Sequence, residues 1–224
     1  MLLPAKDEAE NLGPLLERAR ALGFKAVVCD DGSSDGTAQV AAEAGALVLR
    51  HEENRGLAEA LRTLFSWAAD HLEDSDVVVT MDADGTMDPA EALPALGALE
   101  RGEADLVVFS RYRAGYQVPL SRALLSLGAR LVLASRFRIP GITDYTTGFR
   151  AYRVGFLRAY RERHPRWFDA SGFTAQTELL VKAHRMGARI AEAPGRVDYG
   201  RKRGRSKMRL LRTALEYLSL ALKG

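Results

Sequence analysis

The sequence predicts an α/β fold, a doubly wound and mostly parallel sheet flanked by helices, on three observations. Short apolar runs alternate with helical patterns through the first half of the chain. The two clearest runs, DVVVTM at 76–81 and DLVVF at 105–109, are apolar at nearly every position, as buried parallel strands are. Acidic clusters also follow three of the expected strands, at the edge where open parallel sheets bind ligands.

The first half of the chain supplies strands and helices in alternating order. The expected strands cover residues 1–3, 25–29, 46–49, 76–81 and 105–109. The expected helices cover residues 8–22, 36–44, 56–71 and 89–101. Ser34 or Asp35 can cap the second of these helices. Asp88 followed by Pro89 is typical of an N-cap and the first helical position.

The second half loses this regular alternation. Helices are expected at 120–137, which is rich in Leu and Ala, and at 154–163 and 174–186. Short strands are expected at 148–152, 189–193 and 196–199. The last stretch, 206–222, predicts an amphipathic helix, because apolar residues recur there at helical spacing.

Composition places the chain among ordinary globular proteins. Its 224 residues are 47% hydrophobic and 27% charged, which argues against disorder and fits one domain with a tail. The lone Cys29 can form neither an intramolecular disulfide nor a zinc cluster, so we expect a reducing, cytoplasmic location. No run approaches the roughly 18–20 apolar residues of a spanning helix, so we expect none.

The net charge of +3 hides an asymmetry along the chain. Residues 196–224 hold nine basic side chains against two acidic ones, so the remainder is net negative. Such a segment favours an anionic partner, which could be nucleic acid, a phosphorylated substrate or an anionic lipid surface. A solvated basic face is the alternative for a charge run that stands alone.

Three acidic clusters follow expected strands. One is DDGSSDGT at 30–37, which by itself would more often be a polar turn with a helix cap. Another is PAKDE at 4–8. In the third, MDADG at 81–85, Asp82 and Asp84 can both face one divalent cation, such as Mg²⁺ or Mn²⁺. Each cluster alone is a weak signal, and their convergence on one edge strengthens all three.

Seven motifs in order give the chain a clear family resemblance. They are PAKDEAENL, CDDGSSDGT, MDADGTMDP, ADLVVFSRY, DYTTGFRAYR, GFTAQTELL and RKRGRSKM. The chain resembles the family-2 glycosyltransferases of GT-A fold, and among them the polyprenyl- and dolichyl-phosphate sugar transferases. It departs from the family pattern at Asp7, where Asn is usual, and at Phe109, where a small residue is usual.

The resemblance implies a site for a nucleotide-sugar donor. The nucleotide-binding residues that it implies are Pro4, Ala5, Asp7, Glu8, Asp30, Asp31, Asp82 and Ala83. Asp82, Asp84 and Gln176 would hold the Mg²⁺ or Mn²⁺ cofactor, and an amide oxygen suits such a hard cation. Without its motif, Gln176 would be taken for a residue on a helix surface.

The resemblance also implies a catalytic set with several cations. It comprises Asp82, Asp84, Arg111, Arg150, Arg201, Ser206 and Lys207. The arginines and the lysine would hold phosphate oxygens, and Ser206 would donate a further hydrogen bond. We expect no general base, because a polyprenyl phosphate is already an anion. Asp144 and Glu178 are the rival bases, and Asp144 could instead orient Arg150.

Other polar and aromatic residues receive no catalytic role. The four histidines, His51, His71, His164 and His184, are scattered and share no metal-ligand spacing. Trp67 is expected in the core, and Trp167 is expected to be structural, with a role facing sugar or lipid as the alternative. Neither a P-loop nor a G-x-G-x-x-G after the first strand is present.

The leading interpretation is a metal-dependent, inverting enzyme that moves a hexose from a GDP- or UDP-sugar to a polyprenyl phosphate. We expect a catalytic domain over 1–200 and a basic amphipathic tail over 201–224. Residues 120–137 and the tail could bind the anionic inner face of the cytoplasmic membrane peripherally, or 120–137 could simply pack on the sheet. The alternatives are transfer to a hydroxyl acceptor in polysaccharide or glycolipid synthesis and a non-enzymatic anion- or RNA-binding module. We expect no nucleic-acid partner, because aromatic residues are sparse in the tail.

Overall fold

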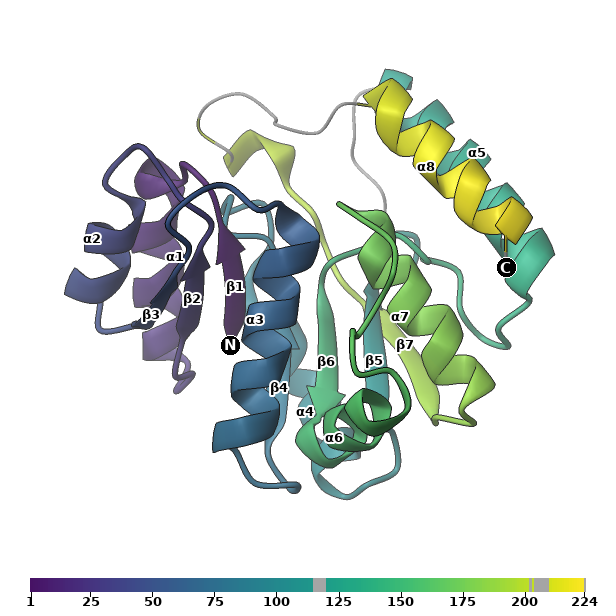
Figure 1. Ribbon diagram of the computed structural model, residues 1–224, viewed down its shortest axis with the longest axis horizontal. Coiled ribbons are helices and arrows are strands. Elements are labelled where there is room, and N and C mark those ends of the chain that lie inside the picture. Colours follow the sequence, from purple (N-terminus) through teal and green to yellow (C-terminus); the bar gives the residue numbers. More distant parts are fainter. Residues whose placement is uncertain (115–119, 202, 204–209, 224) are drawn as a thin grey trace.

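The computed structural model describes residues 1–114, 120–201, 203 and 210–223. One seven-stranded sheet, in the order β3-β2-β1-β4-β6-β5-β7, forms its centre (Figure 1). The strands are β1 (Leu2–Ala5), β2 (Val27–Asp30), β3 (Leu47–Arg50), β4 (Val77–Thr80), β5 (Leu106–Ser110), β6 (Arg150–Arg153) and β7 (Ile190–Pro194). Strand β6 runs antiparallel to β4 and β5, and the other neighbours are parallel. The predicted mostly parallel α/β sheet is therefore confirmed.

Helices cover both faces of this sheet. They are α1 (Ala9–Ala21), α2 (Thr37–Glu43), α3 (Leu57–His71), α4 (Leu93–Glu100), α5 (Leu120–Phe137), α6 (Val154–Arg163), α7 (Thr174–Arg185) and α8 (Leu210–Lys223). Neighbouring strand residues point to opposite faces. Leu2 and Val27 join the core against α3, α6 and α7, whereas Leu3 and Val28 join the core against α1, α2 and α4. The continuous apolar runs are explained by this double burial.

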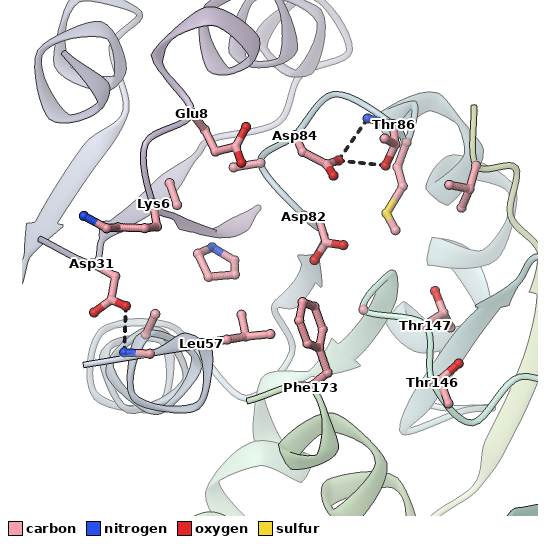
Figure 2. A pocket seen from close by; sticks show the side chains of 18 of the residues that line it. Lys6, Glu8, Asp31, Leu57, Asp82, Asp84, Thr86, Thr146, Thr147 and Phe173 are labelled. Carbon is pink, nitrogen blue, oxygen red and sulfur yellow. Dashed lines mark hydrogen bonds between the residues drawn. The ribbon is translucent and has the colours of Figure 1, made fainter. Parts of the chain in front are cut away.

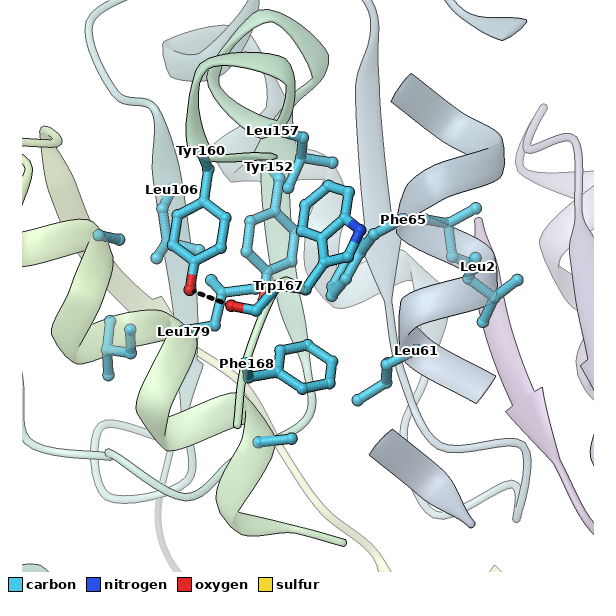
Figure 3. Packing of buried hydrophobic residues seen from close by; sticks show 14 of the residues in the cluster. Leu2, Leu61, Phe65, Leu106, Tyr152, Leu157, Tyr160, Trp167, Phe168 and Leu179 are labelled. Atoms are coloured by element: carbon cyan, nitrogen blue, oxygen red, sulfur yellow. Dashed lines mark hydrogen bonds between the residues drawn. The ribbon is translucent and has the colours of Figure 1, made fainter. Parts of the chain in front are cut away.

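Aromatic side chains fill the core beneath α3 and α6 (Figure 3). Trp167 is 1% exposed, and its ring centroid lies 5.8 Å from that of Tyr160 and 5.4 Å from that of Phe65. Its indole nitrogen donates to Ser66 Oγ at 3.0 Å. Trp167 is thus a core residue and does not face a ligand. Trp67 is partly buried against the same core.

One expected strand is wrong. Residues 196–199 form no strand and lead into the 3₁₀ turn η2 (Tyr199–Arg201). Their backbone is paired outside the sheet, because Asp198 N donates to the Thr86 carbonyl at 2.8 Å and Arg196 N donates to the Glu91 carboxylate at 3.0 Å. These bonds carry the chain over the carboxyl ends of the strands instead of along an edge strand.

Several other expected elements differ in their limits, and two of these differences have a clear physical cause. The helix expected at 89–101 begins as the 3₁₀ turn η1 (Pro89–Ala92) before α4, and Asp88 caps it by accepting from Ala90 N at 3.0 Å. Strand β1 extends to Ala5, beyond the expected residue 3, because Pro4 and Ala5 continue the parallel register with β2.

Helices α5 and α8 lie side by side at one end of the molecule (Figure 1). Arg136 Nε donates to the Ala221 carbonyl at 3.0 Å, and Leu133, Tyr217 and Ala221 are buried. Helix α5 therefore packs on α8, and its Leu133 also joins the core that contains the strand residues Leu106 and Val108. Among the described residues, no helix combines the length and the apolar character needed to cross a membrane.

Candidate active site

The carboxyl ends of β1, β2 and β4 open onto a cavity of about 320 Å³ (Figure 2). The predicted site residues that line it are Pro4, Ala5, Glu8, Asp31, Asp82, Ala83, Asp84 and Arg111. Described residues that were predicted for the site but lie outside this lining are Asp7, Asp30, Arg150, Gln176 and Arg201. Ser206 and Lys207 lie outside the described residues. Their roles and those of the other predicted site residues stay predictions.

The loop after β1 is held by the loop after β2. Asp7 has a positive φ of 46°, and its backbone N donates to Ser33 Oγ at 2.9 Å. Its Oδ1 accepts from Ser34 N at 2.8 Å, and this hydrogen bond is the main reason that the pKa of Asp7 is lowered. Glu8 N donates to Thr37 Oγ1 at 2.8 Å. Asp7 therefore joins the two loops, and its neighbour Glu8 lines the cavity.

Asp30 and Asp31 have different surroundings. Asp30 is fully buried, accepts from Ser33 N at 3.1 Å and lies 3.3 Å from the Arg50 guanidinium. Asp31 lines the cavity, and its carboxylate accepts from the backbone N of Gly56 at 2.8 Å. The family resemblance implies a nucleotide-binding role for both carboxylates, whereas only Asp31 lines the cavity.

Gly32 lets this loop pass close to the turn before α3. It has a φ of 66°, and a Cβ there would lie 2.4 Å from the backbone carbon of Glu53. A larger residue would push apart the two segments that surround Asp31. The glycine of the DDGS motif is therefore required by backbone contact.

The D-x-D motif places two carboxylates at the cavity wall (Figure 2). One oxygen of Asp84 accepts from Thr86 N at 3.1 Å and from Thr86 Oγ1 at 2.7 Å, which fixes the orientation of this side chain. Asp82 points from the end of β4 toward the segment around Gly148. Both carboxylates line the cavity, and their role as ligands of one divalent cation stays a prediction.

Gln176 of α7 lies outside the cavity lining but close to Asp82. It is buried, and its Oε1 has no hydrogen-bond partner among the described residues. A Cβ built on Gly148 would lie 3.0 Å from both terminal atoms of the Gln176 amide and 3.1 Å from Asp82 Oδ1. Glycine at this position thus leaves a small gap between an amide oxygen and a carboxylate.

Carboxylate and amide oxygens are the ligand types that Mg²⁺ and Mn²⁺ prefer. The donor set of Asp82, Asp84 and Gln176 therefore fits a hard divalent cation. The described residues contain no group of three or more His, Cys, Asp or Glu side chains that could hold a metal. Substrate oxygens would have to supply further ligands, as they commonly do for Mg²⁺.

Arg111 is held in a defined orientation at the cavity wall. It lines the cavity and donates to both oxygens of Asp144, from Nε at 2.7 Å and from Nη2 at 2.8 Å. Asp144 also accepts from the backbone N of Thr147 at 3.1 Å. Burial raises the pKa of Asp144, but the charge of Arg111 and the hydrogen bonds from Arg111 and from the backbone N of Thr146 outweigh it and hold the pKa below its usual value. The alternative that Asp144 orients Arg150 is therefore wrong, because its guanidinium partner is Arg111.

Arg150 is fully buried behind the cavity. Its guanidinium donates to the Gln176 carbonyl and, at 2.9 Å, to the Tyr145 carbonyl. It therefore supports the backbone of the residue whose amide faces Asp82. Glu178, the other rival base, accepts from the backbone N of Asp169 at 3.0 Å. Neither Glu178 nor Asp144 is among the described residues that line the cavity.

The basic tail begins at the rim of the cavity. Asn11 connects Glu8 to the tail, because Asn11 Nδ2 donates to Glu8 Oε2 at 2.8 Å and to the Arg203 carbonyl at 3.1 Å. Arg203 N in turn donates to Asn11 Oδ1 at 2.9 Å. Arg201 forms an ion pair with Asp88 at 3.6 Å. The sequence assigns Arg203 no role, and these contacts place its backbone beside Asn11, at the start of α1.

Several lining residues were not selected from the sequence. They are Lys6, Leu57, Thr146, Thr147, Phe173, Val197 and Tyr199, among others. Thr146 and Thr147 stand inside a motif that was recognised, so the motif itself was the available signal. Val197 and Tyr199 belong to the segment that was expected to be a strand, and for that reason they were not selected as cavity residues.

Comparison with known proteins agrees with this architecture. The sequence profile "Glycosyl transferase family 2" matches residues 1–161. Undecaprenyl-phosphate mannosyltransferase of Micrococcus luteus is 33% identical over 203 residues, which cover 86% of this chain and 80% of that protein. Dolichyl-phosphate hexose transferase of Haloferax volcanii is 35% identical over 188 residues, which cover 83% of this chain and 75% of that protein.

A solved structure also resembles this one. It is glucosyl-3-phosphoglycerate synthase from Mycobacterium tuberculosis in complex with Mn²⁺, UDP-glucose and phosphoglyceric acid. The TM-score is 0.73 at 22% identity, over 99% of this chain and 77% of that chain. With the observed sheet order, this likeness identifies the architecture as the expected GT-A fold.

Proposed function

For this chain, which belongs to glycosyl transferase family 2 and is a glycosyltransferase, we propose transfer of a hexose from a GDP- or UDP-sugar to a polyprenyl phosphate. The two relatives named above support the choice of a lipid phosphate as the acceptor class. The cavity at the carboxyl ends of the strands supports the choice of a nucleotide-sugar as the donor.

The observation that carries the proposal is the engagement of the two carboxylates that could have served as a base. Asp144 accepts hydrogen bonds from the Arg111 guanidinium, and Glu178 accepts hydrogen bonds from the backbone N of Asp169 and Ala170. A hydroxyl acceptor would need a positioned base near the anomeric carbon. A phosphate acceptor is an anion before it binds, so it needs cations and alignment instead.

A nucleotide-sugar donor bound in the cavity would contact three regions of it. The nucleoside would lie between the loop of Pro4 and Lys6 and the carboxylate of Asp31. The diphosphate would lie near Asp82 and Asp84, where Mg²⁺ or Mn²⁺, when bound, would neutralise its negative charge. The sugar would then face the segment around Thr146 and the guanidinium of Arg111.

The transfer itself is a single displacement at the anomeric carbon. An oxygen of the acceptor phosphate forms the new bond, and the bond from that carbon to the diphosphate oxygen breaks. The electron pair leaves with the nucleoside diphosphate, and attack from the opposite face inverts the configuration. Arg111 would hold phosphate oxygens in line, because Asp144 fixes its side chain in one orientation. Arg201, Ser206 and Lys207 remain candidates for the same task.

Peripheral membrane contact is part of the proposal, because a lipid phosphate must be reached at a bilayer surface. Leu131 of α5 and Leu215, Leu218 and Leu222 of α8 are exposed. Apolar side chains beside a basic segment are typical of helices that lie in the plane of a membrane interface.

The direct test is a transfer assay with radiolabelled GDP-mannose or UDP-glucose, a short polyprenyl phosphate and Mn²⁺. We expect label in the organic phase for the wild type. We expect none for Asp82→Ala or Asp84→Ala, although both variants should remain folded by circular dichroism. Full activity in excess EDTA, or no lipid product with either donor, would contradict the proposal.

A further inference from the structure

His51 is a buried imidazole one residue behind the cavity wall. It follows β3, is 7% exposed, and its Nδ1 lies 2.7 Å from Asp31 Oδ1. Its Nε2 lies 2.9 Å from Oγ1 of Thr63 on α3. The ring therefore connects a residue of the cavity wall to a helix that packs on the sheet.

These partners determine where the ring carries hydrogen. A carboxylate only accepts hydrogen bonds, so Nδ1 must carry a hydrogen in either protonation state of the ring. In the neutral ring, Nε2 accepts from the Thr63 hydroxyl, which can donate. Cys29 Sγ lies 3.6 Å from Nε2, and burial, followed by the charge of Asp31, raises the pKa of Cys29 to about 12. The neighbouring sulfur is therefore a thiol, and it does not compete with Asp31 as an anion.

The hydrogen bonds to Asp31 leave one oxygen able to accept more. Oδ1 accepts from His51 Nδ1 and, at 2.9 Å, from Arg55 N, which is the ordinary capacity of one carboxylate oxygen. Oδ2 accepts from Gly56 N at 2.8 Å. It therefore retains capacity for a further donor, and Asp31 lines the cavity beside Lys6 and Leu57 (Figure 2).

We infer that His51 is a positioning residue for the nucleotide: it fixes the rotamer of Asp31 so that Oδ2 accepts from the nucleoside. This inference rests on the proposed donor site. Because the carboxylate only accepts, the ligand group must be a donor, which means a ring N–H of uracil or guanine, the amino group of guanine or a ribose hydroxyl. His51 itself touches no substrate and takes no part in the transfer.

Two side chains separate this role from simple core packing. Asparagine can place its amide nitrogen near the position of Nδ1, whereas glutamine places its amide nitrogen nearer to that of Nε2. Both remove the imidazole and both are polar, so their effects on stability should be similar. Only His51→Asn keeps a donor for Asp31.

The experiment is calorimetric binding of UDP and GDP, with Mn²⁺, to the full chain and its variants. We expect His51→Gln to weaken binding of the better nucleotide about tenfold and His51→Asn to remain within about threefold, the scale of one hydrogen bond to a charged group. In the transfer assay, His51→Gln should raise the donor KM and leave kcat nearly unchanged. His71→Gln, on the exposed side of α3, is the matched control and should change neither the nucleotide affinity nor the donor KM.

A coupling measurement supplies the second criterion. Asp31→Asn should weaken nucleotide binding, and adding His51→Gln to it should weaken binding little further, because both changes disturb one contact. If Asp31→Asn weakens binding but His51→Gln does not, the inference is overturned and the donor site stands. If His51→Asn and His51→Gln lose affinity in proportion to their fall in unfolding temperature, the role is structural and the inference is overturned. If the wild type binds neither nucleotide, the proposed donor site itself is wrong.

Discussion

Single residues decide whether the cavity can hold a charged donor. Gly148 is the clearest case, because a side chain there would enter the space between Asp82 and Gln176. Its backbone needs no positive φ, so its requirement for glycine comes from the neighbouring polar atoms. The sequence contains this glycine inside a recognised motif but does not indicate what its missing side chain would touch.

We predict that Gly148→Ala weakens metal-dependent nucleotide binding. The new Cβ would lie 3.0 Å from the Gln176 amide and 3.1 Å from Asp82 Oδ1, so at least one of them must move. Small-to-large changes in tightly packed sites cost about 1–3 kcal/mol. If this whole cost reduces the binding free energy, the affinity falls by roughly 5- to 150-fold. The thermal shift produced by nucleotide and Mn²⁺ measures this loss. Gly128→Ala, where no described atom lies within 4 Å of the new Cβ, is the control.

The Arg111–Asp144 pair should make stability depend on pH in a defined direction. The pKa of Asp144 lies below its usual value of 3.8, so its contribution is complete above about pH 4 and is lost as the pH falls through the folded-state pKa. Asp144→Asn leaves the guanidinium without its buried partner and should cost about 3–5 kcal/mol at pH 7. Urea unfolding at pH 7, 5 and 3 checks both statements. Both statements would be contradicted if the difference in free energy of unfolding between the wild type and Asp144→Asn increased toward pH 3.

Residue types could be predicted from the sequence better than their orientation. The chain order of the motifs identified Asp31, Asp82 and Asp84, and all three line the cavity. The same motifs also contain Asp30 and Arg150, whose side chains are turned into the protein interior. Which of two neighbouring polar residues faces a cavity depends on loop backbone angles, and these depend on contacts with distant segments.

At the scale of elements, the cavity is made by the ends of strands and by segments that cross over them. The positions of most strands and helices followed from hydrophobic periodicity, because a sheet covered on both faces needs continuous apolar runs. Residues 196–199 have the same apolar and polar alternation as a strand. Their hydrogen bonds to Thr86 and Glu91, far away in the sequence, decide their course, and periodicity carries no information about those partners.

The pair α5 and α8 is the element that we expect to contact the membrane. We predict that Leu215→Ser with Leu222→Ser reduces co-sedimentation with anionic vesicles by about tenfold or more, because each leucine loses about 1.5–3 kcal/mol of apolar burial. Both side chains are exposed, so the fold should persist. Leu93→Ser, an exposed leucine of α4, is the matched control and should bind vesicles like the wild type. Unchanged binding by the double variant would remove these helices from the membrane contact.

At the scale of the whole molecule, the seven-stranded sheet brings distant motifs to one cavity. The loop of β1, the D-x-D after β4, the Arg111 turn after β5 and the start of the basic tail meet at the carboxyl ends of the strands. Family membership follows from the sequence, and the fold follows from both sequence and structure. Donor nucleotide, sugar and acceptor depend on the shape of the cavity, which no motif reports.

The central claim is that the acceptor is a phosphate and that the protein supplies no general base. It is tested most directly by initial rates with a polyprenyl phosphate and with the polyprenol of the same length, from pH 5.5 to 9, for the wild type and Glu178→Gln. We predict transfer to the phosphate alone, a Glu178→Gln rate within a few-fold of wild type, and an acid limb near pH 6, about where a phosphate monoester gains its second charge. Comparable transfer to the polyprenol, with a loss of about a hundredfold or more in Glu178→Gln, would contradict the account.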